Sequence, residues 1–508
     1  MSLSFRLSSG PNRAARIRWQ EWGPEAFAQA AQSDRPIFLV VATVWSAACR
    51  VLDETALSAD AVIRILDESF VAVRIDGDRM HHVQDRYITD GWPTTCFLTP
   101  TGEVLWSATA PDTATLLRVA TDVATAWRER RDEFAAEIAR RRHAYEMAQR
   151  RTKTVGLVRR DTAEGVLNAL RTSFDARNGG FGDAPKFPPA DAVELLLALA
   201  AAGDDEAGAM AVRTLEGIRA GELIDDSDGG FYRYALEADW TKPRREKLLD
   251  VNAGMLRAYA TGAALHRRED WRETCENTVS WVERTLVRPD GLWGGSQIAD
   301  ARYFEGDASA RGSMTAPPRD PTLYTDRAAG WISALVDAGR LLGRDEWVTR
   351  GRDALATLLP AMKGGAEIWH WHDDGQVQLS GLLCDAVALL RACLAVHRAT
   401  GDAGFLDQAK CVQNVLEKTF WAETGGFWDH ATASPVGAVR DRQKPFGWNA
   451  EAARALLALS RASGERGPSA RAERTLAVLS ATAPRYGAEA AGFVMAVYTF
   501  FDSAWAGA

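Results

Sequence analysis

Four residues at a predicted strand-to-helix turn decide whether the chain can carry dithiol chemistry. The tetrad Ser46-Ala47-Ala48-Cys49 follows the apolar run "RPIFLVVAT" and a Trp, where dithiol oxidoreductases keep a Cys-x-x-Cys pair. Disulfide exchange needs an attacking thiolate and a second thiol. Ser46 occupies the attacking position, so we expect no dithiol chemistry here. Cys96 is the other cysteine of this region, and either a Cys49–Cys96 pair or two inert core cysteines fits the sequence.

Acid-base chemistry has candidates further along the chain. Glu246, Asp326 and Asp385 stand at the starts of predicted helices, and His370 and His372 lie in the segment "EIWHWHDD". Two groups whose pKa values are pushed apart can serve as general base and general acid, as epimerase, isomerase or hydrolase chemistry requires. A carboxylate at a helix start can instead stabilise its own first turn, and a loop histidine can simply be solvated. Both alternatives stay open.

Basic and aromatic residues near these groups are candidates for binding. A flat aromatic ring can stack on the C–H face of a sugar or polyol while polar side chains bond its hydroxyls, and basic groups can hold an acidic substituent. Alternatively, the aromatic residues can pack against one another and hold the long loops together. We expect the binding residues to converge on one cavity; they are Lys186, Arg233, Tyr234, Trp240, Arg244, Lys247, Asp300, Trp369, Trp428 and Trp448.

Helices must position these residues, because the chain from residue 155 to residue 508 reads as twelve helical segments. Ala/Leu-rich segments such as "SGLLCDAVALLRACLAV" alternate with amphipathic ones such as "WRETCENTVSWVERTL". A helix that is apolar on most faces is buried, and an amphipathic helix lies outside. Short links follow the apolar helices and long links follow the amphipathic ones, with repeated Gly-Gly turns. Six hairpins closing into an (α/α)6 toroid are predicted, with the long loops around a funnel at the N-terminal ends of the inner helices.

The N-terminal third has a different pattern. A strand, a helix with Ser58 as its predicted N-cap, and a second strand precede a Trp-Pro step, a hairpin and a final helix. This order predicts a thioredoxin-like α/β domain over 1–130. Residues 131–154 are predicted to form a connecting helix; its Arg-rich end is interspersed with acids, which favours a solvated surface over a nucleic-acid stripe. The whole chain is therefore expected to be mainly α.

Composition excludes several classes of partner and cofactor. The 60 basic and 68 acidic residues give a net charge of −8, which argues against nonspecific binding to nucleic acid or an anionic membrane. No apolar run reaches the roughly 18 residues of a membrane span, and we expect no secretory signal. The six cysteines form no Cys-x-x-Cys and no cluster with zinc spacing, so we expect a reducing cytoplasm, no metal site and no cofactor.

Several segments resemble one family along essentially the whole chain. They are "GWPTTCFLTPTGEV", "GGFGDAPKFP", "DGGFYRY", "PRREKLL", "GGSQIAD" and "ATGDAGFLDQA". The chain resembles the thioredoxin-domain family that includes spermatogenesis-associated protein 20. The resemblance implies that Pro93 is a cis-proline and that the toroid is similar to N-acylglucosamine 2-epimerase and cellobiose-epimerase folds. Epimerases of that fold deprotonate a sugar carbon with cavity histidines.

The chain also departs from the family's pattern at its polar motifs. Ser46 replaces the first cysteine of the usual pair, Arg244-Arg245 replaces a His-Phe step, and Ile298-Ala299-Asp300 replaces Asp-Ala-Asp. The resemblance therefore implies a sugar-type cavity more firmly than a reaction. We expect the toroid to bind and act on a small sugar-like or polar molecule. The alternative is a noncatalytic binding or scaffold protein that uses its thioredoxin-like domain to dock a protein partner.

The tetrad yields a first testable prediction. The purified protein should not reduce insulin with dithiothreitol as electron donor, because no nucleophilic thiol stands at the turn. Insulin turnover that persists in Cys49→Ser would locate the activity at another thiol. Turnover that disappears in Cys49→Ser would reveal a monothiol mechanism. Either result would contradict the prediction.

Overall fold

A computed structural model describes residues 12–151, 156–365, 367–373, 375–431 and 436–502. Its contacts divide the chain into two compact units. The first unit consists of residues 1–154 and 432–442, and the second of residues 155–431 and 443–508. Within the described residues, no helix is both long and apolar enough to cross a membrane.

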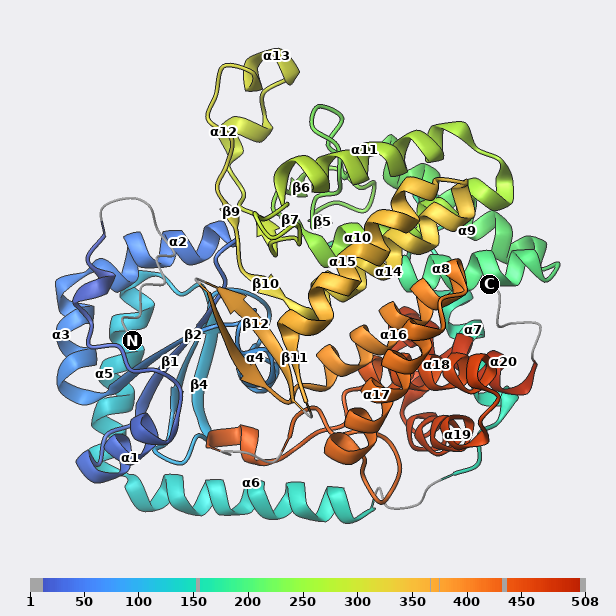
Figure 1. Ribbon diagram of the computed structural model, residues 1–508. Helices are drawn as coiled ribbons and strands as arrows, with labels where there is room; N and C mark the ends of the chain where they lie inside the picture. Colours follow the sequence, from blue (N-terminus) through green and yellow to red (C-terminus); the bar gives the residue numbers. More distant parts are fainter. Residues whose placement is uncertain (1–11, 152–155, 366, 374, 432–435, 503–508) are drawn as a thin grey trace. The chain divides into compact units, whose positions relative to one another are not determined.

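The first unit is built on a four-stranded sheet in the order β2-β1-β3-β4 (Figure 1). Strands β1 and β2 are parallel, and β3 is antiparallel to both β1 and β4. Every residue of β1 is buried, as its unbroken apolar sequence predicts. The strands are β1 Ile37–Ala42, β2 Val71–Asp76, β3 Thr94–Leu98 and β4 Val104–Thr109.

Helices cover this sheet and complete the predicted thioredoxin-like order; they are α1 Pro24–Ser33, α2 Ala47–Glu54, α3 Asp60–Ser69, α4 His81–Tyr87 and α5 Thr113–Glu129. The long helix α6 Arg131–Arg151 follows α5 and contacts it. The Trp92–Pro93 peptide bond is cis, as the resemblance implies. The expected Ser58 cap is wrong: α3 is capped at Ala59, and the Ser58 hydroxyl donates to the carbonyl of Asp53 instead.

The two cysteines of the first unit lie on opposite faces of the sheet. Cys49 packs with Phe38 and Val40, whereas Cys96 packs with Ile37 and Leu39. Adjacent strand residues point to opposite faces, so these two cores are separated by the sheet. Burial raises the pKa of the Cys49 thiol to about 11 and that of the Cys96 thiol to about 12. Both features support the expected absence of dithiol chemistry.

A segment from late in the chain is part of the first unit. Residues 436–442 contain the short helix η3 Gly437–Arg440, and Val439 joins the apolar core around Tyr87. The Tyr87 hydroxyl accepts a hydrogen bond from the amide of Ala438 at 2.8 Å and donates to the carbonyl of Gly102 at 2.9 Å. The long link before residue 446 was expected to belong to the toroid rim; part of it instead completes the thioredoxin-like core.

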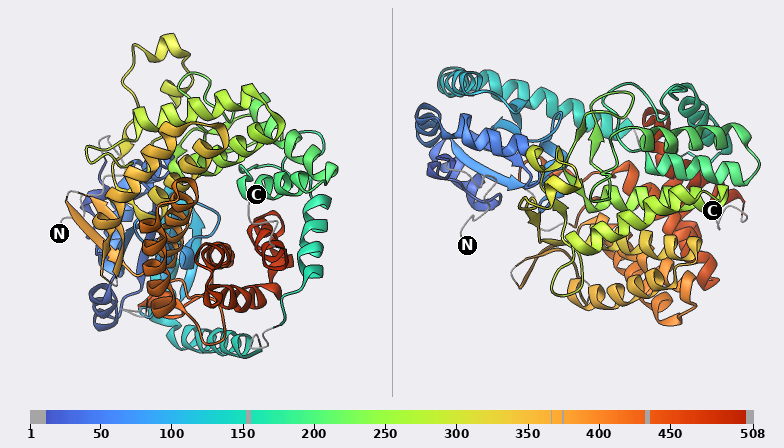
Figure 2. Two further views of the ribbon diagram at one scale, coloured as in Figure 1. Left: turned by 45° about the vertical axis from the view of Figure 1, so that its right-hand side comes forward. Right: turned by 90° about the horizontal axis from the view of Figure 1, so that it is seen from above.

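The second unit is a ring of helical hairpins, coloured green to red in Figure 2. Six helices line its central cavity; the described inner helices are α8 Ala190–Ala201, α10 Leu249–His266, α14 Thr325–Leu342, α16 Leu383–Thr400, α18 Phe446–Ser463 and α20 Ala491–Phe501. Neighbouring inner helices pack together, and α20 packs on α8 to close the ring. The described outer helices are α7 Arg160–Thr172, α9 Asp205–Ala220, α11 Glu269–Thr285, α15 Asp345–Met362, α17 Ala403–Phe420 and α19 Arg466–Ser480. This is the predicted (α/α)6 toroid.

Short strands and two small helices occupy the long links. Among them, α12 and α13 lie on an excursion that projects away from the neighbouring helices (Figure 1). The elements are β5 Tyr234–Ala235, β6 Pro243–Arg244, β7 Lys247–Leu248, β8 Ser296–Gln297, α12 Ala301–Phe304, α13 Ala308–Arg311, β9 Arg319–Asp320, β10 Leu323–Tyr324, β11 Lys363–Gly364, β12 Glu367–Asp373 and β13 Gln376–Ser380.

Candidate functional site

A cavity of about 420 Å³ lies between the six inner helices. It is lined mainly by the C-terminal halves of those helices. Among the described residues that line it are six arginines and two carboxylates; the charged residues are Arg257, Arg340, Arg391, Arg398, Arg454, Arg461, Glu194 and Asp337. This excess of arginine is local, because the chain as a whole carries more acids than bases.

The arginines occupy repeated positions on the inner helices. Arg257, Arg391 and Arg454 are each the ninth residue of their helix, and Ser333 takes that place in α14. Seven residues further, Arg340, Arg398 and Arg461 are each the sixteenth residue of α14, α16 and α18. Seven residues make nearly two helical turns, so both sets face the cavity, separated by about 10 Å along the axis. We call the first set, Arg257, Arg391 and Arg454, the inner ring, and the second set, Arg340, Arg398 and Arg461, the outer ring.

Ion pairs join the inner ring across four helices. Glu194 of α8 lies 2.5 Å from Arg257 and 3.8 Å from Arg454. Glu451 of α18 lies 2.9 Å from Arg454 and 2.6 Å from Arg391. Burial would raise the pKa of Glu451, but Arg391 and Arg454 overcome that effect and hold it at about 2. The result is an alternating belt of guanidinium donors and carboxylate acceptors around the cavity.

The cavity opens where the inner helices end. The Arg257 side chain of the inner ring is 12% exposed, whereas that of Arg398 in the outer ring is 46% exposed. Arg340 and Arg461 are exposed as well. The described lining contains none of the fifteen residues predicted from the sequence. The expected funnel at the other end of the inner helices is thus not where this cavity lies.

Two of the predicted binding lysines are occupied within their own loops. The Lys186 ammonium donates to Asp175 at 2.5 Å and to the carbonyl of Gly179 at 2.7 Å. Lys247 repeats this geometry, with Asp225 at 2.5 Å and Gly229 at 2.7 Å. Both lysines are buried. Each closes the Gly-Gly turn of its long loop, so both ammonium groups serve the scaffold.

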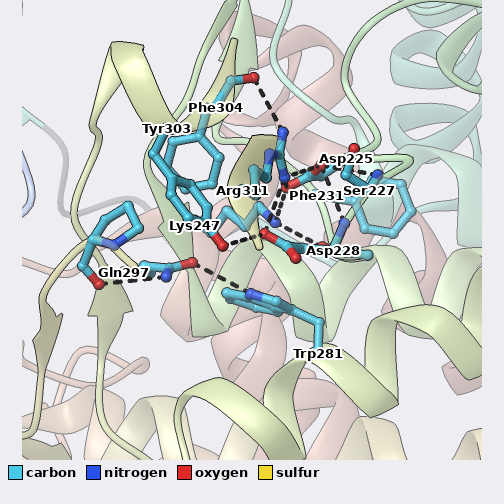
Figure 3. A network of polar contacts seen from close by, with 12 residues as sticks. Asp225, Ser227, Asp228, Phe231, Lys247, Trp281, Gln297, Tyr303, Phe304 and Arg311 are labelled. Carbon is cyan, nitrogen blue, oxygen red and sulfur yellow. Dashed lines mark hydrogen bonds and ion pairs between the residues drawn. The ribbon is translucent and has the colours of Figure 1, made fainter. Parts of the chain in front are cut away.

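The Lys247 cluster extends to the excursion that carries α12 and α13 (Figure 3). The Arg311 guanidinium donates to Asp225 at 2.8 Å and to Asp228 at 3.0 Å. Burial lowers the pKa of Lys247 to about 8, although the Asp225 carboxylate opposes this shift. The Tyr303 hydroxyl also donates to Asp228 at 3.1 Å. Arg311 was absent from the sequence-based candidates, and it anchors the excursion to the loop before β5.

The other loop candidates are also engaged locally. Glu246 is buried beside Arg233, 3.3 Å away, and the side chain of Asp300 caps α12. Trp240 is 1% exposed, and its indole donates to the carbonyl of Asn178 at 2.9 Å. Tyr234 stacks on Phe187, with ring centroids 4.5 Å apart. The remaining binding candidates are exposed or half-buried; they are Arg244, Trp369, Trp428 and Trp448.

Three predicted acid-base residues do meet. The His370 Nδ1 atom of β12 lies 3.0 and 3.1 Å from the carboxylate oxygens of Asp385 in α16. The amide of Asp326 donates to Asp385 at 3.1 Å. Burial raises the pKa of Asp385 to about 6, although His370 opposes this shift. His372 lies apart from this dyad and contacts Arg288 at 3.2 Å.

One residue group has a geometry that suits a metal ion. Among the described residues, potential ligand atoms of His370, Cys384 and Asp385 lie within 4.8 Å of one another, and all three side chains are buried. Sequence spacing did not predict this group, because His370 comes from a strand and the other two from the next helix. His370 and Asp385 already satisfy each other by hydrogen bonding.

The belt and the outer ring were missed by the sequence analysis. Their signal is nevertheless present, as an Arg-Ala step at the centre of three apolar helices: "LRAY", "LRAC" and "ARAL". Each arginine is followed seven residues later by a charged or small residue in the same register. Arginine in a helix that is otherwise apolar on all sides indicates a polar axis.

Comparison with known proteins gives a family match in the first unit and structural matches to the toroid. Residues 11–146 match the family Thioredox_DsbH, described as a protein of unknown function, DUF255. The chain is similar to spermatogenesis-associated protein 20. The human protein is 26% identical over 321 residues, which are 58% of this chain and 41% of the relative. An uncharacterized Caenorhabditis elegans protein is 28% identical over 56% of this chain and 42% of its own length. The resemblance predicted from the motifs is confirmed, while the matched region is less than half of each relative.

Solved structures confirm the toroid. A sugar epimerase from a ruminal bacterium has a TM-score of 0.50 at 13% identity and covers 61% of this chain and 82% of its own. Cellobiose 2-epimerase from Bacillus thermoamylovorans has a TM-score of 0.51 at 12% identity and covers 62% of this chain and 85% of its own. A D-mannose isomerase has a TM-score of 0.50 at 14% identity and covers 62% and 84%. At these identities the likeness establishes the fold alone.

The buried Lys247 cluster predicts a large stability difference between two lysines. Lys247→Met should lower the free energy of unfolding by about 3 kcal/mol. This value is at the lower end of the range for breaking a buried ion pair, because Arg311 still pairs with Asp225 in the variant. Lys242→Met is the matched control, because that lysine pairs with Glu237 in solvent. Urea unfolding followed by tryptophan fluorescence measures both. Equal midpoints for the two variants would contradict the structural role of Lys247.

The raised pKa of Asp385 predicts that the stability difference between the parent and Asp385→Asn depends on pH. Its folded pKa, about 6, lies above the unfolded value near 3.8, so its contribution to stability is full below pH 4 and is lost as pH rises through 6. Asparagine does not titrate. The free energy of unfolding of Asp385→Asn minus that of the parent should therefore rise between pH 4 and 7, by on the order of 2 to 3 kcal/mol. Asp353→Asn, on the exposed face of α15, controls for loss of a surface carboxylate. A pH-independent difference would overturn this assignment.

Proposed function

We propose that the second unit binds a small sugar-like or otherwise polar molecule in the cavity between its inner helices. The alternating belt of Arg257, Glu194, Arg454, Glu451 and Arg391 carries this proposal. Guanidinium donors beside carboxylate acceptors match the hydroxyl groups of a sugar, which both donate and accept. The cavity volume of about 420 Å³ lies in the range of small-molecule sites. The sugar epimerases that share the toroid add support.

The chemistry we propose is of the epimerase, isomerase or hydrolase type. An arginine stays protonated and cannot take up a proton, so a proton acceptor in this cavity must be a carboxylate. Glu194 lines the cavity between Arg257 and Arg454 and is our candidate for that role. Glu451, with its low pKa, stays ionised and positions Arg391 and Arg454.

The His370–Asp385 dyad is a second place for proton transfer. A carboxyl with a pKa of about 6 is suited to acid-base work near neutral pH. Asp385 precedes Arg391 of the belt by six residues of α16, which is about 9 Å along the helix axis. If Glu194 serves only to bind the ligand, we propose that the His370–Asp385 dyad, beside Asp326, carries out the proton transfer.

A noncatalytic binding protein is the competing function. Histidine is missing from the described cavity lining, and both carboxylates of the belt are already paired with arginine. In that case the first unit, whose Cys49 and Cys96 thiols are buried, docks a protein partner and carries out no disulfide exchange.

All six cysteines are free, which supports a reducing compartment such as the cytoplasm.

A ligand screen with variants of Arg257 and Glu194 tests the proposal. Neutral and acidic mono- and disaccharides are added to the parent, and thermal shift, then calorimetry, identifies binders. Arg257→Gln should weaken their binding by about tenfold or more, because a charged hydrogen-bond donor is lost. Arg257→Lys keeps the charge in case Arg257→Gln does not fold. Glu216→Gln, on outer helix α9, is the matched control for Glu194→Gln and should bind as the parent does.

The outcomes separate the candidate functions. NMR of each bound sugar reports epimerisation, isomerisation or hydrolysis. Turnover lost in Glu194→Gln assigns the proton acceptor to the cavity, and turnover lost only in Asp385→Asn assigns it to the dyad. Binding without turnover favours the noncatalytic function. A panel in which no compound binds, or binding that ignores Arg257, would refute the cavity as the site.

A further inference from the structure

The outer ring, which consists of Arg340, Arg398 and Arg461, is a feature that a neutral sugar does not need. Its members come from three consecutive inner helices and stand at the same register, the sixteenth residue of each. All three are exposed at the open end of the cavity and line it. Any molecule that enters from this end passes them.

The inner and outer rings differ in charge balance. In the belt, Glu194 and Glu451 offset the arginines, and Arg257 also has Asp191 at 3.4 Å. In the outer ring, Asp337 pairs with Arg398 at 2.5 Å. The described lining residues at that level include one carboxylate, that of Asp337. Among the described lining residues at this level, three positive charges therefore face one negative charge, and the Asp502 carboxylate outside the lining acts on Arg461. The Arg461 guanidinium bonds a neutral partner, the carbonyl of Thr499 at 2.6 Å.

Stabilisation of helix ends does not by itself account for the shared register of the outer-ring arginines. Basic residues in a last turn interact favourably with the helix dipole wherever on that turn they lie. Arg340, Arg398 and Arg461 are basic residues in the last turns of their own helices, so each also stabilises its helix end. The dipole does not require the common register or the common direction toward the cavity that these arginines have. Their common placement indicates a shared ligand group.

We propose that the ligand carries an anionic group, a carboxylate or a phosphate, that the outer ring holds at the mouth while the belt binds its polar body. This inference rests on the proposed function, since it assumes that the cavity is the binding site. Planar guanidinium groups match carboxylate and phosphate oxygens through paired hydrogen bonds. The distance of about 10 Å between the rings suits a sugar acid or sugar phosphate that spans both levels.

Matched neutral and acidic sugars test the proposal. Glucose, glucuronate and glucose 6-phosphate, and other neutral and acidic pairs from the screen, are titrated calorimetrically. Acidic members should bind more tightly than their neutral counterparts, and higher salt should weaken that preference. The glucuronate and phosphate arms distinguish the two anionic groups.

Variants of the outer ring supply the decisive comparison. Arg340→Gln combined with Arg461→Gln should reduce affinity for the acidic compounds by about 10- to 100-fold and leave neutral binders within about twofold. Both residues are exposed, so this variant should fold; Arg352→Gln on outer helix α15 is the matched control. Inorganic phosphate should compete with the acidic compounds in the parent.

The failures of the two proposals are distinguishable. If neutral sugars bind as tightly as acidic ones and depend on Arg257 but not on Arg340 and Arg461, the anionic ligand is refuted while the cavity remains the site. If acidic compounds bind independently of both rings, the cavity itself is refuted. Binding that depends on both rings and prefers the acid supports both.

Discussion

Closure of the helical ring is the constraint on which the second unit depends. Each inner helix contacts two inner neighbours and the outer layer, so only one face remains for polar groups. In α16 every residue from Leu383 to Leu390 is buried, and Arg391 is the first to emerge. Four of the described inner helices, α10, α14, α16 and α18, have 18 residues each and share a register, so the face toward the axis returns every seven residues. The two rings of arginine follow from this geometry.

The long links have a different physical basis. A Gly-Gly turn leaves carbonyl groups without helix or sheet partners, and a buried cation satisfies them. Lys186 and Lys247 do so together with an aspartate. Lys444 bonds the Gly425 carbonyl and the hydroxyl of Thr424 instead, and burial lowers its pKa to about 8. Lys186 and Lys247, which resemble binding groups in the sequence, therefore hold their loops together instead.

The first unit keeps a fold whose usual chemistry its residues do not support. The sheet, the cis-proline and the helix after the turn are present, yet Ser46 stands at the attacking position and Cys49 is buried. The segment 436–442 adds Val439 to its core and pairs Arg440 with Glu103. The unit's stability thus depends on chain from beyond the toroid's outer helix α17, which couples the two units covalently at more than one point.

Sequence alone determined the elements and their layering. The twelve main toroid helices and the thioredoxin-like order were predicted because periodicity, glycine turns and motifs are local signals, and the cis-Pro93 was implied by the family resemblance. Tertiary structure decided which polar residues remain available. Lys247 reads as a ligand group until Asp225 and Gly229 are seen around it, and Arg391 reads as one charge in an apolar helix until ring closure sets it beside Glu451. Burial and ion pairing arise between elements distant in the chain, and spacing along one helix does not encode them.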